Sequence, residues 1–188
     1  MIYAAKDGKD TKVACHDMLF TLSDVRARIV EVWDNWCRLE EDYRPIIHYY
    51  LGDLTQRSPY PFHRILNLSR AVEVYHRKAV KGTGHLDERM RCLWERQSSR
   101  MQELLGKKDT LAKQVLNARH YYTHYNRDYS EDAGSEAVLA IRLGILLTSI
   151  ILQELGFSND EIDQMAASCK GADTFQIVTF VAYHTTTC

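Results

Sequence analysis

The amino-acid sequence predicts an all-α fold, a bundle of helices packed around one hydrophobic core. Apolar residues recur every three to four positions along most of the 188-residue chain, which is the spacing of one face of a helix. Short polar connections separate these periodic segments, as in a helical bundle. With 45% hydrophobic and 26% charged residues, the composition is typical of a globular protein and argues against disorder.

The first half of the chain contains three predicted helices. The first begins near Ser23 and has an apolar face formed by Val25, Ile29, Val32, Trp33, Trp36 and Leu39. Pro45 suits the first position of a short second helix, which we expect Gly52 to end. After a turn, a long helix is predicted over residues 62–80, with a stripe formed by Phe62, Ile65, Leu66, Ser69, Val72 and Tyr75.

The second half contains four more predicted helices. Apolar periodicity predicts helices over residues 86–105 and from Asp109 to Asn126. The run from Ala137 to Leu155 is the most apolar in the chain, but it includes charged residues and stops at a glycine. We therefore interpret it as the central core helix and not as a membrane span. A capping box at residues 158–161 predicts one more short helix.

We expect three parts in the chain. Residues 1–22 form an N-terminal lead-in, residues 23–168 form the helical domain, and residues 169–188 form a tail that is either a strand or an extended arm. The N-terminus lacks the apolar core of a signal peptide, and the five cysteines are scattered without a CxxC pair. These features favour a cytoplasmic protein without a disulfide framework or a zinc knuckle.

Charge is unevenly distributed along the chain. The net charge is only −1, which by itself argues against a nucleic-acid-binding protein. However, residues 57–127 hold 15 Lys/Arg and 6 Asp/Glu, a balance of +9, whereas residues 128–188 hold 2 and 9, a balance of −7. The middle segment can therefore attract phosphates, although solvated helix faces would have the same composition.

The segment from Asn117 to Asn126 is the densest group of chemically active side chains. On a helix, His120 and His124 share a face, and Arg119 lies beside His120. An arginine can hold a phosphate oxygen and offset charge in the transition state. A histidine can remove a proton from a ribose 2′-hydroxyl or donate one to the leaving oxygen. This combination suits RNA cleavage without a metal or other cofactor.

Two other interpretations of this segment stay open. It can be an ordinary amphipathic helix with aromatic core residues and polar histidines at its rim. Alternatively, His120 and His124 can hold zinc, since the HxxxH spacing is used for this metal. Against a metal site, no glutamate follows His120 in an HExxH pattern. His63, His76 and His85 are candidate third ligands only if the fold brings them close.

Two segments resemble a known family. Arg119 to His124 resembles the signature of the HEPN superfamily, an arginine followed four to six residues later by a histidine. The stretch from Ile65 to Arg77 resembles the first core helix of the ApeA-like HEPN branch. In this chain, as in that branch, an apolar helix follows the segment with the arginine and histidine. The resemblance covers about residues 62–157. One departure is His120, which stands where asparagine is commoner.

The resemblance implies an HEPN-type helical bundle. HEPN proteins usually form homodimers that bring the arginine and histidine of both subunits into one cleft, and many are metal-independent endoribonucleases in antiviral or toxin-type defence. By this resemblance the partners are an RNA substrate, a second copy of the chain, and an N-terminal sensor region or an antitoxin outside it. No membrane is expected.

The resemblance also assigns roles to residues of this chain. His124 would be the general base or acid, Arg119 the phosphate clamp, and His120 the polar neighbour that orients them. Glu73 matches a helix carboxylate of the family and would orient Arg119 or His124, or would be a buried structural acid. Tyr125 would stack on a base or pack against the protein, and packing is the favoured interpretation.

Outside the motif, we expect His76 and Arg77 to form a basic surface that binds substrate. The prediction that combines these assignments is an endoribonuclease acting through 2′-hydroxyl transphosphorylation. The alternatives are a non-catalytic HEPN module that binds nucleotide or RNA or mediates dimerisation, and a metal-dependent hydrolase built on His120 and His124.

Overall fold

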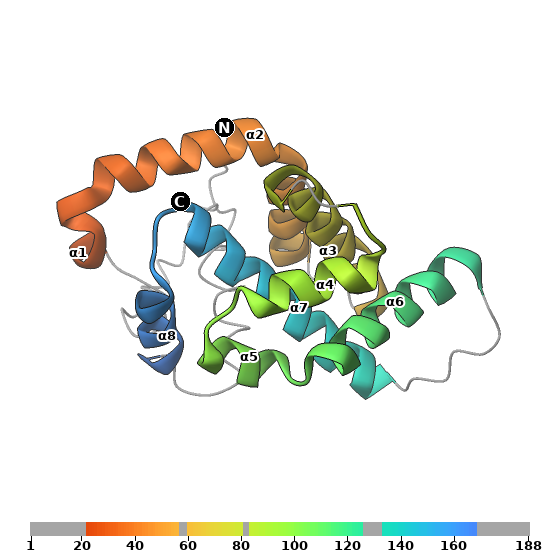
Figure 1. Cartoon of the computed structure of the whole chain (residues 1–188). Helices are drawn as coiled ribbons and strands as arrows, with labels where there is room; N and C mark the ends of the chain where they lie inside the picture. Colours follow the sequence, from red (N-terminus) through yellow and green to blue (C-terminus); the bar gives the residue numbers. More distant parts are fainter. Residues whose placement is uncertain (1–21, 57–59, 81–82, 126–132, 169–188) are drawn as a thin grey trace, which may run out of the picture.

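In the computed structural model, residues 22–56, 60–80, 83–125 and 133–168 are described, and the regular elements within these ranges are all helical (Figure 1). The predicted all-α class is therefore confirmed. The expected lead-in and tail lie outside these ranges, apart from residue 22. The elements are α1 (Leu22–Val25), η2 (Arg26–Arg28), α2 (Ile29–Gln56), α3 (Pro61–Tyr75), η3 (His76–Val80), α4 (Leu86–Glu95), α5 (Ser99–Leu105), α6 (Lys108–His124), α7 (Ala133–Glu154) and α8 (Asn159–Ser168).

Helix α7 lies in the middle of the molecule, with α2 on one side and α5 on the other (Figure 1). It packs most extensively on α3, which also contacts α2 and α6. The inner residues of α7 have almost no exposed surface, as expected for the predicted core helix; they include Leu143, Leu146, Leu147 and Ile150. Removing this apolar surface from water is the main force that stabilises the bundle.

By length and composition, Gly134–Glu154 is the one helix among the described residues that is apolar enough to cross a membrane. However, 67% of its most apolar stretch is buried inside the protein. A helix that is apolar on all sides is expected at the centre of a bundle. The burial agrees with the prediction of a core helix.

The predicted break before Pro45 is present, but the predicted end at Gly52 is wrong. Tyr43 has non-helical backbone angles (φ −123°, ψ 23°), so two helical stretches meet there within α2. Pro45 follows this kink, where its missing N–H costs little. A single glycine in a helix costs only about 1 kcal/mol relative to alanine, and α2 continues to Gln56.

The predicted helix over residues 86–105 is two helices. Helix α4 ends at Glu95, and the Ser98 side chain accepts the backbone N–H of Met101 as the N-cap of α5. The buried Gln97 side chain fills the junction, because its amide donates to the Leu93 carbonyl at 3.0 Å and its oxygen accepts the Ser149 hydroxyl at 2.6 Å. The first bond satisfies a backbone carbonyl at the end of α4, and the second ties the junction to α7.

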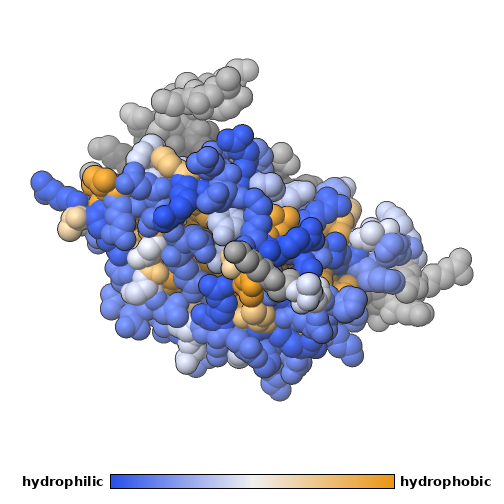
Figure 2. Space-filling model, turned by 45° about the horizontal axis from the view of Figure 1, so that its top comes forward, coloured by the Kyte–Doolittle hydropathy of each residue, from blue (hydrophilic) through white to orange (hydrophobic). Residues whose placement is uncertain are grey.

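The apolar face predicted for the first helix is only partly covered. Val32 and Leu39 are buried, but Ile29, Val30 and Trp33 are 42%, 69% and 63% exposed. Ile29 and Trp33 thus belong to the predicted apolar face of this helix but lie outside the buried core. In the view of Figure 2 the surface is largely hydrophilic, with hydrophobic residues in small separate patches.

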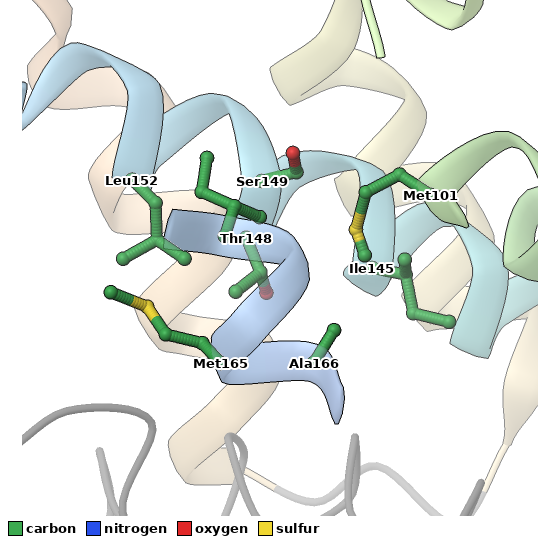
Figure 3. Close-up of a pocket in the computed structure, with 8 residues that line it drawn as sticks. Met101, Ile145, Thr148, Ser149, Leu152, Met165 and Ala166 are labelled. Carbon is green, nitrogen blue, oxygen red and sulfur yellow. The ribbon is translucent and has the colours of Figure 1, made fainter. Parts of the chain in front are cut away.

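A small cavity lies where α8 packs against α5 and α7 (Figure 3). Its volume of about 10 Å³ is enough for about one water molecule. The lining is mostly apolar and includes Met101, Ile145, Thr148, Leu152 and Met165. The cavity is therefore a packing gap and not a ligand site.

Candidate functional site

The end of α6 carries the residues that the sequence predicted to be catalytic. This end lies away from the centre of the molecule (Figure 1). His120 and His124 are exposed, and Arg119 is partly buried toward α3. Upstream in α6, Leu111, Ala112, Val115 and Ala118 are fully or almost fully buried. The first part of α6 is therefore packed in the core. Its last turns are polar and accessible, because the regular spacing of apolar residues stops at Ala118.

Arg119 is tethered to α3. Its Nη1 atom donates to Oε1 of Glu73 at 2.8 Å, and the two side chains are 33% and 16% exposed. A charge-assisted bond between partly buried groups holds the guanidinium in place. Because a guanidinium has five N–H donors, the other donors can still bind a phosphate. The predicted contact between Glu73 and Arg119 is present, and its part in activity stays a prediction.

The rings of His120 and His124 are neighbours. Their centroids are 4.9 Å apart with an interplanar angle of 53°. This follows from their spacing of four residues, which places side chains one helical turn apart on the same face. One chain therefore carries two exposed imidazoles side by side. Of such a pair, one ring can accept a proton and the other can donate one.

Tyr122 fixes the end of α6 to two other helices. Its hydroxyl donates to Oε1 of Glu136, a buried acid in the first turn of α7. Its ring stacks on Phe62 of α3, with centroids 4.8 Å apart and an angle of 21°. Sequence reasoning missed Phe62 and Glu136 as supporting residues. Glu136 offers one usable signal, since it is an acid next to the most apolar run of the chain.

Tyr125 does not pack in the core. It caps α6 in the left-handed conformation (φ 51°), and it is 77% exposed. The favoured interpretation that Tyr125 packs against the protein is therefore wrong. A left-handed backbone is strained for a residue other than glycine, and such strain is found at functional sites. The ring lies 6.3 Å from that of Tyr121 and stays accessible to a ligand.

The predicted basic surface of His76 and Arg77 is also wrong in part. Arg77 is exposed, but His76 is only 5% exposed. His76 follows Val72 by four residues and so continues the buried face of α3. Burial, followed by the charges of Arg89 and Arg96, lowers the pKa of His76, because the charged imidazole is disfavoured in this environment.

Among the residues that the structure describes, no three histidine, cysteine, aspartate or glutamate side chains form a group able to hold a metal ion. Zinc sites use three or four protein ligands. The metal-dependent alternative would therefore need a ligand beyond His120 and His124 from outside the described residues or from a second copy of the chain.

Comparison with known families tests the resemblance to the HEPN superfamily. The model of the Apea-like HEPN family matches residues 66–161, just over half of the chain. The chain belongs to the Apea-like HEPN family. The match includes Glu73, Arg119, His120 and His124, so the candidate site lies within the HEPN domain. No curated protein and no solved structure matches the chain.

Membership of the HEPN family narrows the function to a coarse class. It indicates a ribonuclease or a nucleotide-binding module of a defence system. The matched range runs from within α3 into α8, so it contains most of α3 and all of α6 and α7, the three helices that form and support the end of α6. A more specific function must therefore be inferred from the residues at this end of α6.

Proposed function

We propose that this HEPN domain is a metal-independent endoribonuclease that cleaves RNA at the exposed end of α6. The observation that carries the proposal is the adjacent pair of exposed imidazoles, His120 and His124, next to an arginine that Glu73 holds in place. RNA contains its own nucleophile, so a phosphate clamp and two proton-transfer groups are sufficient for the reaction.

The reaction follows from these groups. One imidazole removes the proton of a ribose 2′-hydroxyl, and the oxygen attacks the adjacent phosphorus. The bond from phosphorus to the 5′-oxygen breaks, and a protonated imidazole gives its proton to that oxygen. Arg119 binds the nonbridging oxygens, where negative charge increases. The products carry a 2′,3′-cyclic phosphate and a 5′-hydroxyl.

We assign His124 as the principal proton-transfer residue and His120 as its neighbour, which orients it or supplies the second proton transfer. Glu73 acts as a positioning residue for Arg119. The exposed ring of Tyr125 is suited to stack on a base beside the scissile phosphate. Antiviral or toxin-type defence is the proposed setting, with RNA as the substrate.

A homodimer is part of the proposal. Two copies related by a two-fold axis would present the same surface twice, so that the end of α6 from each copy lines a shared cleft. Light scattering at micromolar concentration should then give about twice the chain mass of 21.8 kDa. A monomer that cuts RNA efficiently would disprove the shared cleft but not the assignment of the residues.

The test is cleavage of single-stranded RNA in excess EDTA, followed by analysis of the product ends. The proposal predicts 2′,3′-cyclic phosphate or 3′-phosphate ends at an undiminished rate. Ends with 5′-phosphates, or activity that returns only with a divalent ion, would contradict it. Tight RNA binding without cleavage would support the non-catalytic HEPN module instead.

A further inference from the structure

A continuous row of aromatic rings joins the start of α3 to the end of α6. Tyr60, which precedes α3, and Phe62 lie with ring centroids 5.7 Å apart, and Phe62 stacks on Tyr122 of α6 at 4.8 Å. From Tyr122 the row continues to Tyr121 at 4.9 Å and then to Tyr125 at 6.3 Å. We call these five residues the aromatic row. Of its two ends, the Tyr125 end has a part in the proposed cleavage reaction and the Tyr60 end has none.

The two ends of the aromatic row are open to solvent. Tyr60 is 56% exposed and Tyr125 is 77% exposed, whereas the three rings between them are partly buried. Among the described residues, the one other large aromatic side chain that is exposed to this extent is Trp33 of α2. Packing of α6 on α3 explains the inner rings, because they connect the two helices. It does not explain why both outer rings lie in solvent.

The exposed polar residues near the aromatic row are neutral or basic. In α3 the exposed residues are His63 and Arg70, which lie two turns apart and therefore on the same side of the helix. The His63 ring contacts that of Tyr60, with centroids 5.8 Å apart. Over residues 117–125, the end of α6 and its cap, the exposed residues include no acid. This composition suits a ligand with negative charge.

The two acids that contact the end of α6 are already paired. Glu73 binds Arg119 at 2.8 Å, and its side chain is only 16% exposed. Glu136 is buried and accepts the Tyr122 hydroxyl. Neither carboxylate is therefore placed at the surface to repel a phosphate backbone. Accessible aromatic rings beside basic groups are the combination that binds single-stranded nucleic acid.

We propose that the aromatic row is a binding track for unpaired bases of single-stranded RNA. The track leads from the cleavage site, where Tyr125 follows His124, to a second base-stacking position at Tyr60. The inference rests on the proposed function for the identity of the nucleic acid. His63 and Arg70 supply positive charge for the phosphates that flank the base at Tyr60. Every base has a π-face, so binding should tolerate many sequences, but bases stacked within a duplex cannot reach Tyr60.

The test is binding of a fluorescent decanucleotide in which every ribose carries a 2′-O-methyl group, measured by anisotropy in EDTA. The methyl group removes the nucleophile, so binding is measured without cleavage. Tyr60→Ala should weaken binding of this single strand about tenfold, the effect of one lost base stack. Tyr60→Phe keeps the ring and should bind like the wild type. A duplex of the same sequence should show no difference between the wild type and Tyr60→Ala.

Two further variants make the result specific. Trp33→Ala is the matched control, because Trp33 is 63% exposed and lies in α2 outside the aromatic row. It should bind the single strand like the wild type. Arg70→Gln should lower the slope of log affinity against log salt concentration by about one, because one phosphate contact is lost. Melting should be unchanged in all of these variants, since each substituted side chain is exposed.

The inference is overturned if Tyr60→Ala binds the single strand as tightly as the wild type, or if Trp33→Ala weakens binding as much. An equal loss of duplex binding in Tyr60→Ala would also overturn it. So would unchanged RNA affinity with a lower mass in light scattering, because the aromatic row would then be an interface between copies of the chain.

The same measurements separate this inference from the proposed cleavage. A wild-type protein that binds the methylated strand through Tyr60 but does not cut unmodified RNA would refute the proposed function and keep the track. Normal cleavage of unmodified RNA, with binding that does not depend on Tyr60, would refute the track and keep the proposed function.

Discussion

The middle of α7 and the end of α6 differ in what their side chains do. Leu143 and Leu146 of α7 are fully buried and belong to the hydrophobic core. At the end of α6, His120 and His124 are exposed, while Arg119 and Tyr122 hold this end to α3 and α7 through acids. The core thus supplies stability, and the end of α6 supplies exposed chemical groups on a fixed support.

The largest effect expected from this contrast is on stability. Leu146→Ala leaves a cavity in the core and should lower the free energy of unfolding by about 2–5 kcal/mol. Val138→Ala, at a 47% exposed position of the same helix, should change it by less than about 0.5 kcal/mol. Denaturant unfolding measures both. Equal losses in the two variants would show that α7 is not the centre of the core.

At the end of α6, a substitution should change RNA binding and leave stability unchanged. Tyr125→Ala removes the exposed ring but keeps the same left-handed backbone requirement, so the strain is unaltered. Loss of one stacked base should cost about 1–3 kcal/mol of RNA affinity, with no change in melting temperature. RNA affinity equal to that of the wild type would show that Tyr125 does not contact a base.

The fold and the motif were predictable from the sequence to different extents. Apolar spacing located the helices and the core helix α7, because burial of one face dictates that spacing. It did not show that Ile29 and Trp33 are exposed, because spacing identifies an apolar face without showing what covers it. The polar character of His76 suggested a surface position, although its place four residues after Val72 indicated burial.

The supporting contacts of the site were less predictable. The pairing of Arg119 with Glu73 came from the family resemblance, since the two residues are 46 positions apart. The contacts of Tyr122 with Phe62 and Glu136 depend on how α3, α6 and α7 meet. No local sequence pattern predicts how these three helices are placed relative to one another, because the packing of the whole bundle determines their placement.

The tether between Glu73 and Arg119 should affect activity more than stability. Glu73→Gln keeps the size of the side chain but removes its charge, so Arg119 is held less firmly. We expect about a tenfold fall in kcat with little change in KM, because a poorly placed clamp acts mainly in the transition state. Melting should change little, since ion pairs that are partly exposed contribute at most about 1 kcal/mol.

Glu40→Gln is the matched control for Glu73→Gln. Glu40 pairs with Arg44 on α2 at 2.8 Å, far along the chain from the proposed site. This variant should leave kcat and melting unchanged. A fall in melting for Glu73→Gln without a fall in kcat would identify a structural acid.

The smallest expected effect is the pH dependence due to His76. Its pKa is lowered in the folded protein, first by burial and then by Arg89 and Arg96, so the unfolded chain binds the proton more readily. Stability from this residue is therefore present above the unfolded pKa of about 6.5 and decreases as pH falls through that value. Melting from pH 7.5 to 5 should fall less steeply in His76→Gln. Identical slopes would contradict the assignment.

The most direct test of the central claim compares His124→Ala with His48→Ala in RNA cleavage under excess EDTA. Both residues are exposed histidines, but only His124 lies at the end of α6. Loss of a general acid or base lowers the rate about 10²–10⁴-fold. We expect a decrease of that size in His124→Ala, with unchanged melting, and the wild-type rate in His48→Ala. Wild-type cleavage by a folded His124→Ala protein would contradict the account.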